Sequence, residues 1–101
     1  MPAESTADAI TATWRAESAR LVGALTRMTR SVELAEDLAQ DALVAALEQW
    51  PAQGIPTNPA AWLMTTAKRR GIDHFRRAEN LRRKSEELGH AEINGGEEQM
   101  P

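Results

Sequence analysis

A chain of 101 residues is long enough for one small domain and leaves little room for a second hydrophobic core. It contains no cysteine, which excludes disulfides and thiolate-bound metals, and no apolar run approaches the roughly 20 residues that span a bilayer. The formal net charge is −3, but positive and negative residues are separated along the chain. Residues 68–84 carry eight cations against two anions, and residues 31–67 carry five anions and no cation.

The sequence predicts an all-α fold, a compact bundle of three or four helices, because no segment shows the alternation of β-branched residues that is typical of strands. The first helix is expected to begin at Ser5 or Thr6, where a hydroxyl can cap it, and to end near Thr29. Its apolar residues recur at helical spacing and are expected in the core: Ile10, Trp14, Leu21, Val22, Leu25 and Met28.

A second helix is expected to begin after an N-cap at Ser31 and to end at Trp50, because Pro51 follows. One side of this helix is apolar and predicted to be core: Ala35, Leu38, Ala39, Ala42, Leu43, Ala46, Leu47 and Trp50. The other side is acidic with one apolar interruption: Glu33, Glu36, Asp37, Gln40, Asp41, Val44 and Glu48. An exposed apolar residue among carboxylates is typical of the centre of an interface, so this side predicts a protein partner.

Residues 51–59 include three prolines and one glycine, which predicts a stiff connector. Asn58 is expected to cap a third helix whose first residue is Pro59 and whose end lies near Leu81 or Leu88. The predicted core side of this helix holds Ala60, Leu63, Met64, Ala67, Gly71, His74, Phe75, Ala78 and Leu81. Gly71 on that side indicates that another helix crosses closely there. The helical domain is predicted to span residues 1–88, followed by a disordered acidic tail or linker over residues 89–101.

The opposite side of the third helix is polar and cationic: Thr65, Arg69, Asp73, Arg76, Asn80 and Arg83, flanked by Lys68 and Arg77. A helix of this kind can pack on its neighbours and contact a phosphate backbone at the same time. Asp73 and Glu79 are too few to pair the eight cations, so nucleic-acid contact is favoured over a merely solvated face. Trp62, at the start of the helix, could stack on an unpaired base or pack under the connector or against the first helix.

No catalytic arrangement is found, so no enzyme is predicted. The two histidines, His74 and His90, have no partners at metal-ligand spacing, and there is no glycine-rich phosphate loop. No metal or cofactor is therefore expected. The opening residues MPAESTADAI lack the features of a secretory signal, and with the absence of cysteine this predicts a cytoplasmic protein.

The segments AEDLAQDALVAALEQW (35–50) and NPAAWLMTTAKRRGIDHFRR (58–77) resemble region 2 of bacterial RNA polymerase sigma factors, most closely the extracytoplasmic-function group. The resemblance covers roughly residues 10–85. It implies that the helix over 33–48 binds the clamp helices of the polymerase β′ subunit. The residues implied are Asp37, Gln40 and Asp41, with Glu33, Glu36 and Val44 nearby.

The same resemblance implies that residues 58–80 recognise the promoter −10 element and hold its non-template strand open. The implied DNA-binding residues are Asn58, Trp62, Thr65, Arg69, Asp73, Arg76 and Arg77, with Lys68 and Arg70 on the backbone and Asn80 on the same polar side. Family members also carry a helix-turn-helix domain that reads the −35 element, so the chain is expected to be a fragment. The alternative is a small helical interaction module, bound for example by an anti-sigma regulator, without a DNA role.

Overall fold

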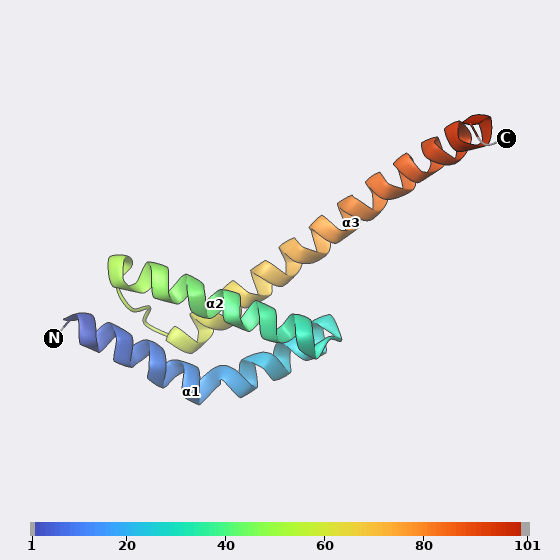
Figure 1. Cartoon of the computed structure of the whole chain (residues 1–101). Coiled ribbons are helices and arrows are strands. Elements are labelled where there is room, and N and C mark those ends of the chain that lie inside the picture. Colours follow the sequence, from blue (N-terminus) through green and yellow to red (C-terminus); the bar gives the residue numbers. More distant parts are fainter. Residues whose placement is uncertain (1, 100–101) are drawn as a thin grey trace. The chain divides into compact units, whose positions relative to one another are not determined.

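The computed structural model describes the backbone of residues 2–99 and the side chains of residues 6–89 (Figure 1). It consists of three helices, α1 (Pro2–Thr29), α2 (Val32–Gln53) and α3 (Pro59–Gln99), and the described residues contain no strand. The predicted all-α fold is therefore confirmed. The chain divides into two units, of which the first ends at Gly71 and the second begins at Ile72.

In the first unit, α1 and α2 lie side by side and run in opposite directions (Figure 1). They are joined by a tight turn in which Arg30 has a positive φ of 59° and donates its N–H to the carbonyl of Thr26 at 2.7 Å. Ser31 caps α2 as predicted, because its hydroxyl accepts a hydrogen bond from the N–H of Leu34 at 3.1 Å. The predicted end of α1 at Thr29 is also confirmed.

The predicted start of α1 is wrong. The helix begins at Pro2, so Ser5 and Thr6 lie inside it rather than at its start. Proline suits the first turn of a helix because the N–H that it lacks would have no partner there.

The core of the first unit combines a few large side chains with many alanines. Trp50, Leu21 and Leu25 are the largest fully buried residues. Three alanines of α2 are completely covered: Ala35, Ala42 and Ala46. Small side chains at these positions let the helix backbones approach closely, so the core of this short chain is thin and tightly packed.

The predicted burial of Leu47 is wrong, because Leu47 is 52% exposed. Ala45, which was not predicted to be in the core, is buried. At about 100° per residue, Leu47 falls beside Gln40 and Val44 on the outer side of α2. The prediction that Pro51 ends α2 is also wrong, since the helix continues to Gln53. Proline in the last turn removes a single hydrogen bond, and the helix ends where Gly54, with a φ of 96°, donates its N–H to the carbonyl of Trp50 at 2.8 Å.

Helix α3 begins as predicted. The Asn58 side-chain oxygen accepts a hydrogen bond from the N–H of Ala61 at 3.1 Å, and Pro59 is the first helical residue. The predicted close crossing at Gly71 is confirmed, because a Cβ atom there would lie 2.5 Å from Met28 Cε and 3.2 Å from Leu38 Cδ1. These first turns of α3 thus pack on both α1 and α2.

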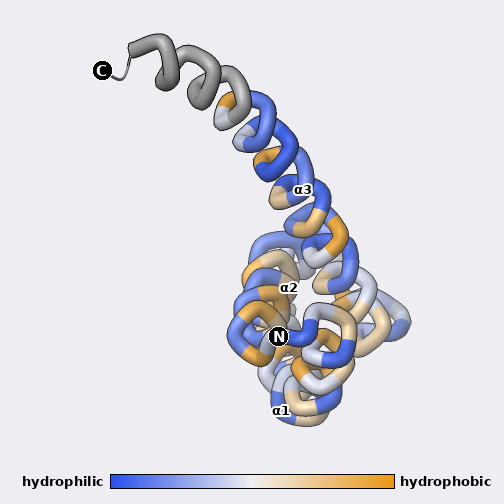
Figure 2. Tube along the Cα trace, turned by 90° about the vertical axis from the view of Figure 1, so that its right-hand side faces the viewer, coloured by the Kyte–Doolittle hydropathy of each residue, from blue (hydrophilic) through white to orange (hydrophobic). Residues whose placement is uncertain are grey.

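The second unit is the remainder of α3, where hydrophilic residues prevail (Figure 2). The predicted burial of its apolar side is wrong beyond Gly71: His74, Phe75, Ala78 and Leu81 are all exposed. The predicted helix end near Leu81 or Leu88 is wrong as well, since α3 continues to Gln99. The side chains of residues 90–101, including His90, lie outside the described part, and the predicted division at residue 88 stays a prediction.

Candidate protein and nucleic-acid interfaces

The outer side of α2 forms an exposed acidic surface. All seven residues that the sequence assigned to it are exposed: Glu33, Glu36, Asp37, Gln40, Asp41, Val44 and Glu48. Val44 is 49% exposed, and the structure adds Leu47 beside it, one turn along. These eight residues are called the acidic face of α2. Leu47 was missed because an unbroken apolar stripe on the inner side was assumed, although its angular position alone places it next to Val44.

The carboxylates of the acidic face are not neutralised within the described chain. No ion pair between residues 6 and 89 involves Glu33, Glu36, Asp37, Asp41 or Glu48. Since α2 contains no Lys or Arg, its outer side presents uncompensated negative charge around two apolar side chains. This arrangement suits a partner with a cationic rim and an apolar centre.

The polar side of α3 is exposed in both units. In the first unit Thr65, Lys68, Arg69 and Arg70 are exposed, and in the second unit Asp73, Arg76, Arg77 and Asn80 are exposed. These eight residues are called the basic surface of α3. None of its five cations takes part in an ion pair within residues 6–89. Their charges are therefore open to an anionic partner, and the predicted contact with nucleic acid stays a prediction.

Two arginines further along α3, Arg82 and Arg83, form ion pairs within the helix. Arg82 Nη2 lies 2.6 Å from Glu79 Oε1 and Arg82 Nη1 lies 3.3 Å from Glu86 Oε1, while Arg83 Nε lies 3.7 Å from Glu79. The hydrogen bond from Arg82, and then the charge of Arg82, lower the pKa of the Glu79 carboxyl below its ordinary value. Arg83, which the sequence placed on the cationic side, is therefore partly engaged within the helix.

Asn58 and Trp62 meet at the first turn of α3, where the N–H of Trp62 donates to the carbonyl of Asn58 at 3.0 Å. Trp62 is half-buried and packs edge to face on Trp50, with ring centroids 5.3 Å apart and an interplanar angle of 73°. Of the two alternatives for this indole, core packing is thus observed, although its partner is Trp50 of α2, which the sequence did not indicate. The pairing depends on tertiary contact between the end of α2 and the start of α3.

The described residues contain no group of three His, Cys, Asp or Glu side chains that could hold a metal ion. None of the helices in that same part of the chain combines the length and apolarity needed to cross a membrane.

The family model of sigma-70 region 2 matches residues 13–81, which is more than half of the chain and contains every candidate residue of both surfaces. The chain belongs to the sigma-70 region 2 family. Region 2 is a non-enzymatic part of factors that initiate transcription through RNA polymerase core and promoter DNA.

The region 2 domain is also similar to an uncharacterized protein of Rhizobium meliloti (strain 1021), with 46% identity over 56 residues. That match covers 55% of this chain and 13% of the relative, so the chain spans a small part of the relative's length. No solved structure matches the chain significantly.

Proposed function

We propose that this chain is the region 2 domain of an extracytoplasmic-function sigma factor, acting in the cytoplasm. The acidic face of α2 binds the clamp helices of the polymerase β′ subunit, and the basic surface of α3 recognises and opens the promoter −10 element. The observation that carries the proposal is the presence, on consecutive helices of a sigma-70 region 2 domain, of two exposed surfaces of opposite charge whose charged groups form no ion pair within residues 6–89.

On α2, Val44 and Leu47 provide an apolar centre, and Asp37, Gln40 and Asp41 lie around it. Burial of the apolar centre supplies affinity, while the carboxylates select a cationic partner and speed the encounter. Because the carboxylates are exposed when free, their contribution to binding falls as salt is added.

On α3, the unpaired cations neutralise phosphates of the non-template strand and release counterions. Short polar groups such as Thr65, Asp73 and Asn80 can contact base edges or sugars between the cations. Asn58 and the exposed part of Trp62 are proposed to line the pocket for an extruded base. Capture of a base that has already left the stack avoids the few kcal/mol of unstacking and is a source of selectivity.

The proposed DNA contact is tested with Arg69→Ala/Arg76→Ala and a fluorescent −10 non-template single strand. The double variant should bind more weakly, and the slope of log affinity against log salt should fall by about 0.7 for each lost phosphate contact. Arg15→Ala/Arg27→Ala on α1 is the matched control, because both arginines are exposed and have no ion pair within residues 6–89. Identical slopes for wild type and the α3 variant would contradict the assignment.

The alternative of an interaction module without a DNA role, bound for example by an anti-sigma regulator, is favoured by one observation, the packing of Trp62 on Trp50. The same titration separates the two functions, because only the sigma-factor function predicts sequence-preferring, salt-dependent binding of the −10 strand. A −35-reading domain beyond Pro101 stays a prediction, which the length of the native reading frame tests.

A further inference from the structure

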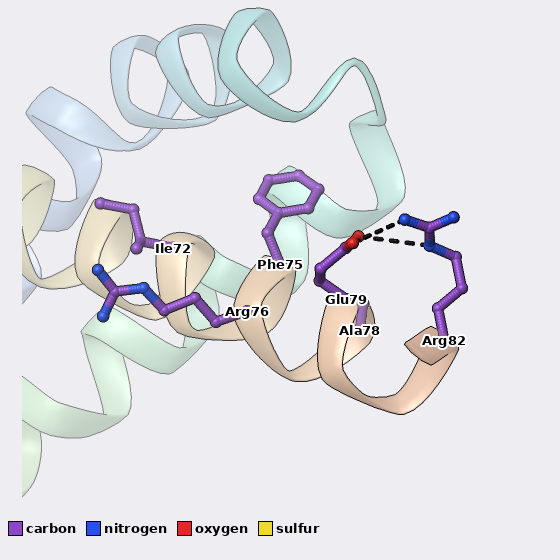
Figure 3. Close-up of a pocket in the computed structure, with 6 residues that line it drawn as sticks. All are labelled: Ile72, Phe75, Arg76, Ala78, Glu79 and Arg82. Atoms are coloured by element: carbon purple, nitrogen blue, oxygen red, sulfur yellow. Dashed lines mark hydrogen bonds and ion pairs between the residues drawn. The ribbon is translucent and has the colours of Figure 1, made fainter. Parts of the chain in front are cut away.

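The second unit carries an open groove whose lining residues, apart from Arg76, are not used by the proposed function. It has a volume of about 480 Å³ and is lined by Ile72, Phe75, Arg76, Ala78, Glu79 and Arg82 (Figure 3). Ile72 is 47% exposed and Phe75 is 43% exposed, one helical turn apart. Large apolar side chains that are exposed next to each other commonly mark an interaction site.

The charges around the α3 groove define what it can accept. Arg76 has no ion pair within residues 6–89, and Arg82 is shared between Glu79 and Glu86. Across residues 68–84 the eight cations exceed the two anions, so the groove lies in a positive field. The lining has an apolar floor and a rim of net positive charge, with Arg76 and Arg82 against Glu79. Such a rim fits a helix whose exposed apolar residues are surrounded by carboxylates.

A helix with these properties is present in the chain itself. On the acidic face of α2, Val44 and Leu47 are exposed at a spacing of three residues, the same spacing as Ile72 and Phe75 in the groove. Asp37 and Asp41 are exposed on the same face, and α2 has no cation that could clash with the rim. We propose that the α3 groove binds the acidic face of α2 from a second copy of this chain.

Each copy carries one acidic face and one groove, so the contact is heterologous and forms closed dimers or longer chains, depending on the rotation between copies. The contact relies on exposed charges and a small apolar area, so it is weak and salt-dependent. Each contact covers the acidic face of one copy and Arg76 of the other, so a copy engaged through both surfaces would be withheld from polymerase and hindered in binding DNA. That consequence rests on the proposed function, whereas the association itself does not.

Sedimentation of the whole chain tests the proposal without polymerase or DNA. At low salt, about 50 mM, the average mass of the wild type should rise with protein concentration, and it should rise less at about 500 mM salt. Asp37→Lys/Asp41→Lys and Arg76→Glu/Arg82→Glu should each stay monomeric. An equimolar mixture of the two variants should associate again, since each reversed surface then meets one of opposite charge.

Matched variants keep the test decisive. Arg15→Glu/Arg27→Glu changes the same number of charges on α1 and should associate like the wild type. Replacing Arg82 also removes its ion pairs with Glu79 and Glu86. Two further variants, Arg76→Glu alone and Phe75→Ala, keep those pairs. Each of them should weaken association about tenfold. A wild type that stays monomeric at low salt, or a mixture that fails to associate while circular dichroism shows both variants folded, would overturn the proposal.

Discussion

Among the described glycines, Gly71 has the least room for a side chain. The Cβ position points at Met28 Cε, 2.5 Å away, and at Leu38 Cδ1, 3.2 Å away. Glycine inside a helix is nevertheless unfavourable by about 1 kcal/mol relative to alanine. At this position the lower helix propensity is offset because the missing side chain lets Met28 and Leu38 approach α3 closely. The flexible end of Met28 is the obstacle that can move.

We expect Gly71→Ala to change the free energy of unfolding by less than about 1 kcal/mol in the wild type, because the gain in propensity is offset by displacement of Met28. In a Met28→Ala background the same substitution should stabilise relative to that background by up to about 1 kcal/mol. Thermal or urea unfolding of the four variants of this cycle measures the coupling. Gly23→Ala is the control, since its Cβ would meet only Arg27 Nη1 at 3.9 Å, and it should stabilise equally in both backgrounds. Equal effects of Gly71→Ala with and without Met28 would contradict the steric account.

Residue-level features were predictable where chemistry within a few neighbours decides them. The caps at Ser31 and Asn58 follow from side chains that bond N–H groups three residues on. The contact between Trp50 and Trp62 was not predictable, because it depends on how the end of α2 meets the start of α3. The pairing of Arg82 and Arg83 with Glu79 was missed, although the spacing of three and four residues was a signal for it.

Among the helices, α3 in the second unit is reinforced by its own side chains. Arg82 contacts both Glu79 and Glu86 across one turn in each direction. Because Arg82 lowers the pKa of Glu79, the ionised carboxylate is favoured in the folded helix. This contribution is present at pH values above the ordinary pKa of a glutamate and is lost as pH falls through the lowered pKa.

Glu79→Gln should therefore reduce the helix content of α3 at neutral pH and have no such effect in strong acid, about pH 2, where Glu79 is protonated in the wild type too. The effect should be small and weaken with salt, because all three partners are exposed. Far-UV circular dichroism across the pH range measures it. Glu87→Gln is the control, since Glu87 is exposed and forms no ion pair within residues 6–89. An equal loss of helix content at both pH extremes would show that the ion pairs are not the cause.

At the level of elements, periodicity predicted which residues share a face and not whether a neighbour covers that face. The apolar side of α3 is buried through Gly71, whereas Phe75 and Leu81 continue the same pattern and are exposed. The end of α2 was misjudged for a different reason. Pro51 lies so near the natural end of the helix that its missing N–H is tolerated, and Gly54 with its positive φ ends the helix.

For the molecule as a whole, the segregation of charge along the chain was the most reliable signal. Every residue predicted for the acidic face is exposed, and so is every predicted DNA-binding residue apart from Trp62. What the sequence could not supply was which aromatic rings pack together and which apolar side chains a neighbouring helix covers. Those outcomes depend on contacts that form only in the folded chain.

The central claim is that the acidic face of α2 and the basic surface of α3 bind different partners independently. The most direct measurement is binding of Asp37→Lys/Asp41→Lys to a β′ clamp-helix fragment and, separately, to the −10 non-template single strand. The account predicts loss of clamp binding, with the salt slope of DNA binding and the helix content unchanged. Clamp binding at the wild-type level by this folded variant would contradict it.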